Sequence, residues 1–429
     1  MPAGIDRTLA SPKGAVIGVE FPRGYGLDDD PLGVVRRGMR TLDERVAEAI
    51  NLAQALNIDV VHSEGVNLSR INPATLIGGG VVERVAAMVA EKKIEVVFVD
   101  APLSPRQQRE LEVELKAKVV DRTGVILDIF AARARTRAGQ LQVEVAQLVY
   151  QQSRLVRLWS HLERQRGGTG KAGGPGERQL DIDKSLLRSR LAKVRAELRE
   201  VEQTRGLQRM ARKKADVPTV ALVGYTNAGK STLFNRLVDA GTLMADALFA
   251  TLDPLMRRLE LPGGLDVVLV DTVGFIADLP HELVEAFKAT LEEVVMADLL
   301  LHVHDLSSPE MDAQAADVRS VLGQIGAADK RVIHAYNKLD KARDVVVPRE
   351  GVAVSAVSGE GVGELLELIR SRLQADWGTV KVQVPASDGR RLAWLHAHGD
   401  VTEQHLNEET WTLVVKLRAS DLAAWRAMA

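Results

Sequence analysis

Short apolar runs alternate with longer amphipathic stretches over the first 130 residues. The apolar runs, rich in β-branched residues, include residues 58–61, 94–99 and 118–120, and the amphipathic stretches span residues 41–56, 81–90 and 104–115. Short apolar runs are typical of buried strands, and apolar positions three and four residues apart are typical of helices. Strands that alternate with helices favour a parallel sheet. We therefore expect residues 1–130 to form an N-terminal parallel α/β domain.

The pattern changes to a heptad repeat over residues 131–215. The repeat positions are Leu141, Val145, Leu148, Gln152, Leu155, Trp159 and Leu162, and then Leu187, Leu191, Val194, Leu198 and Val201. Between the two sets lies the glycine-rich segment 167–176, which cannot continue a helix. Two heptad helices joined by such a segment predict a long antiparallel helical hairpin with a Gly-rich tip.

Strand and helix patterns return over residues 216–375. The runs at 220–223, 267–270, 299–303 and 331–336 are apolar enough for strands covered on both faces. Gly263-Gly264 joins two further strand-like runs and predicts a hairpin, so that one strand is antiparallel. We expect a mixed, mostly parallel six-stranded sheet here. Residues 376–429 predict a small α+β C-terminal domain with strands at 380–384 and 410–415 and a helix at 421–427.

Composition places the 429-residue chain among folded, soluble proteins. Hydrophobic residues make up 46% and charged residues 27% of the chain, which excludes global disorder. The absence of cysteine excludes disulfides, thiolate metal sites and cysteine nucleophiles. No secretory signal starts the chain, and no apolar run approaches the ~20 residues that cross a bilayer. We expect a cytoplasmic monomer without a membrane span.

Positive charge is concentrated in the expected hairpin. Residues 131–214 contain 20 Lys and Arg against 8 Asp and Glu, a net charge of +12, so the rest of a chain of net charge -2 carries -14. Like charges on neighbouring helical turns cost stability, so a one-signed excess favours a polyanionic partner over a merely solvated face. With Tyr150 and Trp159 as its only aromatic residues, the hairpin is expected to contact RNA through phosphates and shape.

Two other patterns are interpreted as structural. Gly78-Gly79-Gly80 lacks the lysine of a phosphate-binding loop, so a flexible turn before a helix is expected. His396, His398 and His405 do not repeat a metal-ligand spacing, and no metal site is expected there.

The segment after the run at 220–223 matches G-x-x-x-x-G-K-[ST], the P-loop. It comprises Gly224, Tyr225, Thr226, Asn227, Ala228, Gly229, Lys230 and Ser231, and Thr232 continues it into a helix-like stretch. Glycines let backbone N–H groups turn toward phosphate, and the helix start adds the positive end of its dipole. Lys230 supplies charge to the β- and γ-phosphates, and the Ser231 hydroxyl ligates Mg²⁺.

Three more segments, each directly after an expected strand, complete a guanine nucleotide site. They are Asp271-Thr272-Val273-Gly274, Asn337-Lys338-Leu339-Asp340 and Ser355-Ala356. Asp271 is expected to reach Mg²⁺ through water, and the Gly274 N–H to reach the γ-phosphate. The Asp340 carboxylate can accept hydrogen bonds from guanine N1–H and the N2 amino group, an arrangement that adenine lacks. Ser355-Ala356 can present a backbone N–H to the guanine oxygen, so the segments together favour GTP over ATP.

At this point the chain resembles the translation-factor-related GTPases, and more closely the HflX family of ribosome-associated GTPases. In the nucleotide region the resemblance rests on residues 224–237, 249–254, 271–276 and 286–291. Elsewhere it rests on residues 71–78, 121–124, 127–130, 133–136, 141–144 and 174–177. The second set discriminates, because any small GTPase shares the first.

The resemblance implies roles for residues in turnover. Thr251, the last residue of Phe249-Ala250-Thr251, matches the switch threonine. The hydroxyl of that threonine ligates Mg²⁺, and its backbone contacts the γ-phosphate. The expected catalytic residues are therefore Lys230, Thr251 and Gly274. Phe275 stands where many GTPases have a water-orienting Gln, and an apolar ring cannot orient water. Slow intrinsic hydrolysis, stimulated by the ribosome, is therefore expected. Asn227 resembles the asparagine that binds K⁺ in some GTPases, which makes K⁺ a candidate cofactor beside Mg²⁺.

The family also implies a partner and an outcome. It binds the large ribosomal subunit when loaded with GTP and separates stalled or idle ribosomes into subunits, with the basic hairpin at 131–214 reaching ribosomal RNA. The C-terminal domain would contact the ribosome near its factor-binding region. Two alternatives stand beside this hypothesis. One is a GTP-switched assembly or storage factor that docks without splitting, and the other is an ATP-driven RNA helicase, which the guanine-reading segment disfavours.

Overall fold

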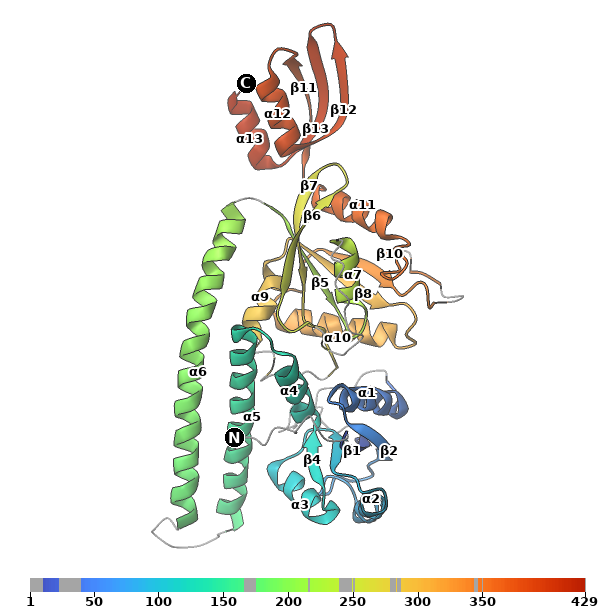
Figure 1. The fold of residues 1–429 in the computed structure, drawn as a ribbon, viewed down its shortest axis with the longest axis vertical. Helices are drawn as coiled ribbons and strands as arrows, with labels where there is room; N and C mark the ends of the chain where they lie inside the picture. The colour runs from blue at the N-terminus through green and yellow to red at the C-terminus, as the bar shows by residue number, and fades with distance from the viewer. Residues whose placement is uncertain are drawn as a thin grey trace.

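The computed structural model is elongated, with three sheets that follow one another along the long axis and a helical hairpin beside two of them (Figure 1). It describes residues 11–22, 40–165, 175–214, 217–238, 249, 251–277, 283, 287–342, 346–348 and 350–428. The fold class expected from the sequence is confirmed. The division into four domains at residues 130, 215 and 375 stays a prediction.

The first sheet contains four parallel strands in the order β2-β1-β3-β4. Its elements are β1 (Lys13–Glu20), α1 (Leu42–Ala55), β2 (Asp59–Asn67), α2 (Gly79–Lys92), β3 (Val96–Asp100), α3 (Pro105–Leu115), β4 (Lys118–Asp121) and α4 (Arg122–Arg133). Thr41 and Ser104 start α1 and α3 with reciprocal side-chain hydrogen bonds to Glu44 and Gln107. Such capping boxes satisfy backbone N–H groups that the first helical turn leaves unpaired.

Two details of this sheet differ from the sequence expectation. Gly78 is the residue that caps α2, and Gly79 and Gly80 belong to its first turn rather than to a flexible turn before it. Strand β2 continues to Asn67, well past the apolar run at 58–61. It lies at the edge of the sheet, where polar side chains can reach solvent, so its second half carries no continuous apolar signal.

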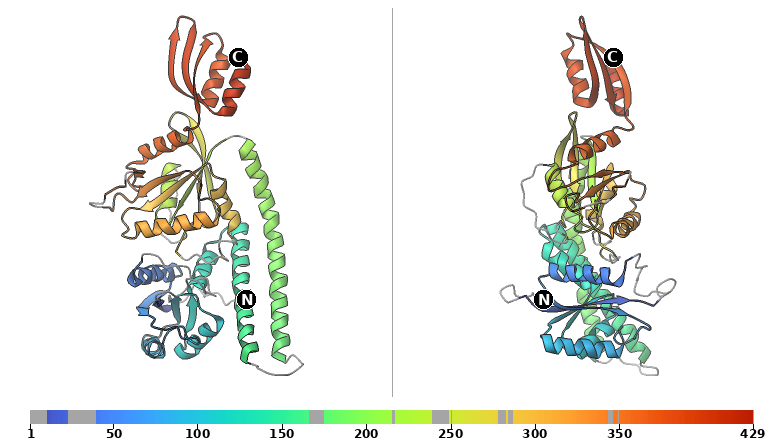
Figure 2. Two further views of the ribbon diagram at one scale, coloured as in Figure 1. Left: turned by 180° about the vertical axis from the view of Figure 1, so that it is seen from behind. Right: turned by 90° about the vertical axis from the view of Figure 1, so that its right-hand side faces the viewer.

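The heptad region forms the expected antiparallel hairpin of α5 (Arg137–Gln165) and α6 (Pro175–Lys214), which lie side by side in Figure 1 and in the left view of Figure 2. Six predicted seam residues are buried: Leu141, Val145 and Leu148 from α5 and Leu191, Val194 and Leu198 from α6. Three others are partly buried: Gln152, Leu187 and Val201. Arg190 pairs with Glu144 at 2.5 Å across the two helices. The side chains of Leu155, Trp159 and Leu162 lie outside the described residues.

The glycine-rich segment ends two residues earlier than expected. Pro175 and Gly176 already belong to α6, so they are helical although the sequence pattern placed them in the loop. Proline is tolerated in the first helical turn because its missing N–H would have no intrahelical partner there.

The second sheet has six strands in the order β10-β9-β8-β5-β7-β6, with only β6 antiparallel, as predicted. The strands are β5 (Thr219–Gly224), β6 (Leu255–Leu261), β7 (Leu265–Asp271), β8 (Leu299–Asp305), β9 (Val332–Asn337) and β10 (Val352–Ala353). Helices α7 (Lys230–Leu237) and α11 (Val362–Leu373) pack on one face, and α9 (Lys288–Met296) and α10 (Met311–Gln324) on the other. Strands β5, β7, β8 and β9 all lead to one edge, where the motifs gather.

The third sheet, β11-β13-β12, is antiparallel and carries two helices. Its elements are β11 (Gly378–Pro385), α12 (Gly389–His398), β12 (Gly399–Asn407), β13 (Thr410–Leu417) and α13 (Ala419–Met428). The sequence pattern missed α12 and β12, because β12 is an edge strand with mostly polar, exposed positions. Among the described residues, no helix has the length and hydropathy that crossing a membrane requires.

Candidate nucleotide-binding site

The P-loop turns sharply between β5 and α7 at two glycines with positive φ. Gly229 has a φ of 87°, and a Cβ atom there would lie 2.2 Å from Asn337 Nδ2. Gly224 is as tightly enclosed, because a Cβ would lie 2.3 Å from the Val303 carbonyl oxygen. Both contacts are well inside van der Waals distance, so only glycine lets the loop approach β8 and β9 this closely.

We expect a Gly229→Ala variant to lose at least tenfold in GTP affinity. The methyl group must displace Asn337, and the left-handed backbone costs about 1–3 kcal/mol with a side chain. Titration calorimetry and thermal unfolding measure the two effects. Gly323→Ala is the matched control, because nothing lies within 4 Å of a Cβ at this position in α10, and its stability should be unchanged or slightly higher. Unaltered GTP affinity in Gly229→Ala would contradict the geometry.

Lys230 is buried in the floor of the loop. Its Nζ donates hydrogen bonds to the carbonyl oxygens of Gly224, at 3.0 Å, and Tyr225, at 2.7 Å. Burial lowers the pKa of Lys230 to about 8, against the opposing effect of the Asp271 carboxylate. A Cβ at Gly274 would lie 3.0 Å from the same Nζ. The ammonium group and the Gly274 backbone are therefore neighbours, as a shared phosphate contact requires.

Three oxygen-bearing side chains converge beside Lys230. Asp271 Oδ2 accepts hydrogen bonds from Ser231 Oγ and Thr251 Oγ1, each at 2.6 Å, and the two hydroxyl oxygens are 2.8 Å apart. Burial raises the pKa of Asp271, against the effect of these hydrogen bonds. Its buried Oδ1 has no hydrogen-bond partner among the described residues. Hard oxygen donors with an unsatisfied buried carboxylate oxygen fit a Mg²⁺ site.

Asn337 holds three parts of the site together. Its Nδ2 donates to the Ala228 carbonyl oxygen at 2.9 Å, and its Oδ1 accepts from the Ala356 backbone N–H at 3.0 Å. The side chain is buried. Asn337 thus fixes the P-loop against the segment that follows β10.

The carboxylate of Asp340 is positioned by a neighbour. Asp340 Oδ1 accepts from Ser355 Oγ at 2.6 Å, and Lys338 forms an ion pair with Asp305 at 2.7 Å. The Ser355 N–H donates to the Glu360 carbonyl oxygen at 2.9 Å, and the Ala356 N–H already donates to Asn337. Either N–H must leave its partner to reach a guanine oxygen. The expected hydrogen bond from Ser355-Ala356 to guanine therefore stays a prediction.

Most of the predicted residues line one cavity of about 310 Å³. Those that line it are Thr226, Asn227, Gly229, Lys230, Ser231, Thr232, Phe249, Thr251, Thr272, Gly274, Asn337, Lys338, Asp340 and Ala356. The lining also includes Lys341 and Val357, which the motifs did not single out. A larger cavity of about 590 Å³ lies at the opposite ends of the strands and contains none of the predicted residues.

The remaining predicted residues do not line the cavity. Five of them are described but are not among the lining residues: Gly224, Ala228, Asp271, Val273 and Ser355. Ala250 lies outside the described residues. Tyr225 is a clear departure from expectation, because its side chain points away from the phosphate loop. Its hydroxyl donates to Glu48 of α1 and accepts from the Ala277 N–H at 2.9 Å.

This tyrosine belongs to a buried polar cluster between the first and second sheets. Arg122, the residue after β4, donates to the Ala277 carbonyl oxygen at 3.0 Å and pairs with Asp100 at 2.7 Å and Glu48 at 3.3 Å. The guanidinium of Arg40 lies 5.0 Å from the centre of the Tyr225 ring. Ala277, three residues after Gly274, is thus connected to α1 and α4, the helices that pack on the first sheet.

The segment around Thr251 contacts α4 on one side of the threonine and the start of the hairpin on the other. Phe249 packs edge-on against Phe130 of α4, with ring centres 4.7 Å apart. Asp253 accepts hydrogen bonds from the backbone N–H of Thr136, at 3.1 Å, and from its hydroxyl. Thr136 directly precedes α5. Sequence patterns could not find these contacts, because more than 100 residues separate the partners.

Family models match the chain along almost its entire length. They are described as the N-terminal region of a GTP-binding GTPase (residues 43–131), its middle region (133–212), a 50S ribosome-binding GTPase (219–338) and the HflX C-terminal domain (342–426).

Curated relatives agree with these matches. GTPase HflX of Magnetococcus marinus is 51% identical over 86% of this chain and 87% of its own length, and GTPase HflX of Escherichia coli K12 is 43% identical over 83% and 85%. A GTP-binding protein of Sulfolobus solfataricus, solved with GDP, is 20% identical, covers 85% of this chain and 99% of its own, and has a TM-score of 0.43.

Proposed function

This chain belongs to the HflX family of GTPases, and we propose that GTP binding and hydrolysis control its attachment to the large ribosomal subunit. One observation carries the proposal: Asp253, two residues after Thr251, accepts hydrogen bonds from Thr136, the residue that directly precedes hairpin helix α5. A shift of the Thr251 segment when the γ-phosphate is lost would therefore be transmitted to the start of the strongly basic hairpin. The match to a 50S ribosome-binding GTPase supports the choice of partner.

In the proposed site, the P-loop and Lys230 hold the β- and γ-phosphates, and Asp340 reads guanine. Ser231, Thr251 and, through water, Asp271 would hold Mg²⁺, which supplies charge neutralisation to the phosphates when bound. The Gly274 N–H would contact the γ-phosphate. GTP is the substrate and GDP the product.

Intrinsic hydrolysis is proposed to be slow. Phe275 is buried, its N–H donates to the Gly224 carbonyl oxygen at 3.1 Å, and its carbonyl oxygen accepts from the Thr226 N–H at 2.7 Å. An apolar side chain fixed in this way cannot orient the attacking water. Ribosome binding would position a group that orients this water. Asn227, which is exposed and has a φ of 61°, remains a candidate K⁺ ligand, and hydrolysis rates in K⁺ and Na⁺ test that role.

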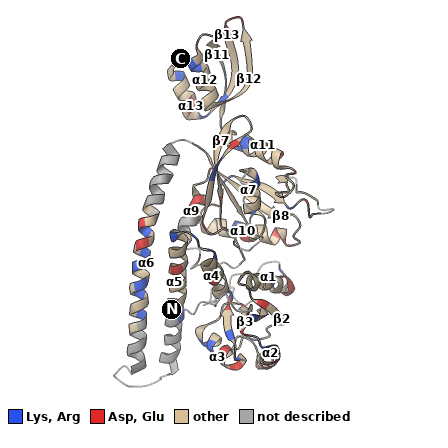
Figure 3. Cartoon of the chain, in the orientation of Figure 1, with Lys and Arg blue, Asp and Glu red and all other residues tan. Residues whose placement is uncertain are grey.

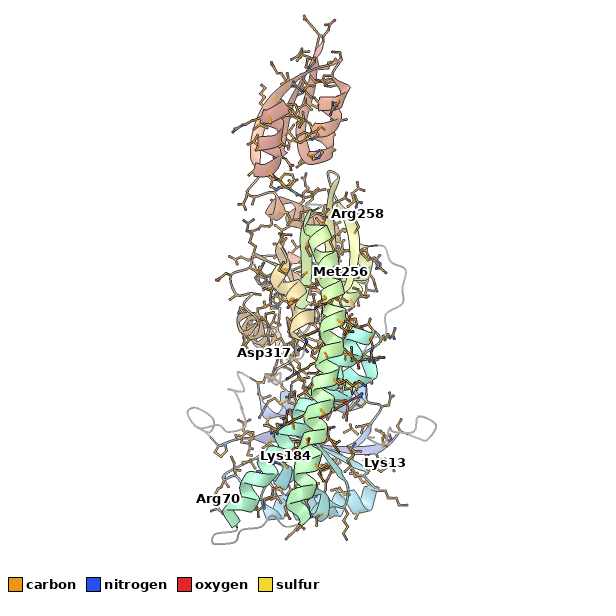
Figure 4. The ribbon with its side chains drawn as sticks, turned by 90° about the vertical axis from the view of Figure 1, so that its left-hand side faces the viewer. Lys13, Arg70, Lys184, Met256, Arg258 and Asp317 are labelled. Atoms are coloured by element: carbon orange, nitrogen blue, oxygen red, sulfur yellow. The ribbon has the colours of Figure 1, made fainter. Side chains whose placement is uncertain are left out.

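The hairpin is proposed to contact ribosomal RNA. Arg188, Arg195 and Arg199 lie seven and four residues apart on α6, so they share one exposed face. Figure 3 shows the Lys and Arg positions that gather along the described part of α6, and Figure 4 shows Lys184 on the same helix. An arm of this length, inserted where the subunits meet, would separate them.

Sucrose-gradient sedimentation of intact ribosomes tests the function. With protein and a non-hydrolysable GTP analogue, splitting predicts free subunits with the protein on the large one. Bound but undivided ribosomes would support the docking alternative instead. Protein that remains at the top of the gradient with every nucleotide would contradict both.

We expect an Asp253→Ala variant to retain its intrinsic GTPase activity but to lose most of the stimulation by large ribosomal subunits. The variant removes the contact with Thr136 but leaves the cavity residues in place, so GTPase activity without ribosomes should stay within about threefold of wild type. Stimulation by large subunits should fall about tenfold, because the hairpin no longer positions the Thr251 segment. Multiple-turnover phosphate release, with and without subunits, measures both quantities.

The matched control is Asp266→Ala, which removes an exposed ion pair with Arg258 inside the second sheet. Its stimulation should equal that of wild type. If Asp253→Ala is also stimulated normally, the hairpin does not act through this contact.

A further inference from the structure

Three histidines cluster on one face of the second sheet, and none of them lines the nucleotide cavity. His302 and His304 are two residues apart on β8 and therefore point to the same face. His334 lies on the neighbouring strand β9, directly opposite His302 in the register, and Tyr336 lies opposite His304. The sequence pattern treated both runs as nearly apolar strands, so this cluster becomes visible only when the two strands are paired.

The imidazole rings are close enough to share one ligand. One ring nitrogen from each histidine lies within 4.8 Å of the other two. His304 Nε2 and His334 Nδ1 are 2.9 Å apart, and the ring centres of His302 and His304 are 3.8 Å apart. His302 and His304 are buried and His334 is partly buried, so solvent reaches the cluster at His334.

The surroundings favour neutral imidazole, which is the form that binds metal. Burial lowers the pKa of all three histidines, that of His304 to about 3, and Arg319 of α10 acts in the same direction on each. Repulsion from neighbouring rings also lowers the pKa of His302 and His304, and Lys230 lowers that of His302. The Glu350 carboxylate acts oppositely on His334 and so offsets part of the effect of Arg319 there.

We propose that His302, His304 and His334 form a binding site for a divalent transition metal of the zinc class. Three imidazole nitrogens are a common protein donor set for zinc and leave one coordination position for water. The cation would take the place of the proton between His304 Nε2 and His334 Nδ1. Among the described residues, the group of possible ligands contains no carboxylate, which disfavours Mg²⁺ or Ca²⁺ as the occupant.

The position of the site gives it a consequence for the nucleotide pocket. His304 directly precedes Asp305, and β9 leads into Asn337 and Lys338, which pairs with Asp305 at 2.7 Å. A metal that joins β8 to β9 would stiffen the pair of strands that carries the guanine end of the pocket. The metal site itself does not depend on the proposed function.

Titration of tag-free protein with Co²⁺ tests the proposal, because Co²⁺ in a tetrahedral histidine site has visible ligand-field bands. We expect saturation at one equivalent and displacement by Zn²⁺. His304→Gln and His334→Gln should each weaken Co²⁺ binding at least 30-fold. The matched control is the double variant His398→Gln and His405→Gln, which removes two exposed histidines of the third sheet and should bind like wild type.

A second measurement needs no variant and so remains decisive if the substitutions impair folding. X-ray absorption of the Zn²⁺-loaded wild-type protein should show three imidazole ligands. One imidazole or none, or Co²⁺ bands that persist in both cluster variants, would overturn the proposal. In that case the histidines form only a neutral stack packed beneath α10. Neither result bears on whether the protein binds ribosomes, so failure here is distinguishable from failure of the proposed function.

Discussion

A Lys230→Ala variant is expected to hydrolyse GTP about 10³-fold more slowly than the wild-type protein. The Lys230 ammonium is buried beside Gly274 and donates to two backbone carbonyl groups, which leaves one of its three N–H donors for a phosphate oxygen. Removal of one such preorganised group costs about 10²–10³ in kcat, and this one also contributes to binding. Single-turnover cleavage of radiolabelled GTP at saturating protein measures the rate.

The matched control is Lys341→Ala. Lys341 lines the same cavity but is exposed to solvent, so its charge is screened and its loss should change the rate less than threefold. Thermal unfolding shows whether both variants are folded. If a folded Lys230→Ala protein cleaves GTP at a rate close to wild type, Lys230 has no catalytic role.

Charge reversal on the hairpin is expected to weaken large-subunit binding about 100-fold. The triple variant Arg188→Glu, Arg195→Glu and Arg199→Glu changes one exposed face of α6 and retains helix-forming residues. Each lost phosphate contact also removes about 0.7–0.9 from the slope of log affinity against log salt. Binding to isolated large subunits at several salt concentrations gives both quantities.

The control reverses an equal charge elsewhere. Arg106, Arg109 and Lys116 are exposed residues in or next to α3, and their replacement by Glu changes the net charge by the same amount. This variant should bind nearly as tightly as wild type. If both triple variants bind equally weakly, only the net charge matters and the hairpin is not the RNA contact.

Much of the site could be predicted from the sequence because phosphate chemistry is local. A sharp turn, a helix start and one lysine must follow a strand without interruption, and residues 224–231 do so. Asp271 and Asn337 were placed correctly for the same reason, since each ends a buried strand and parallel strands end at one edge.

Other features depend on contacts that no local pattern encodes. The P-loop pattern concerns the backbone of Tyr225, whereas its side chain bonds to Glu48, which lies 177 residues earlier in the chain. The histidine cluster requires the register between β8 and β9, and the strand pattern contained only isolated imidazoles. Edge strand β12 was missed because solvent-exposed edges do not need apolar alternation.

The central claim is that the nucleotide in the pocket controls how tightly the hairpin binds the large subunit. Its most direct test is the equilibrium dissociation constant for isolated large subunits, measured with fluorescently labelled protein at constant salt. We predict binding at least 30-fold tighter with a non-hydrolysable GTP analogue than with GDP, and loss of that difference in the Arg188, Arg195 and Arg199 triple variant. Equal affinity with both nucleotides in the wild-type protein would contradict the account.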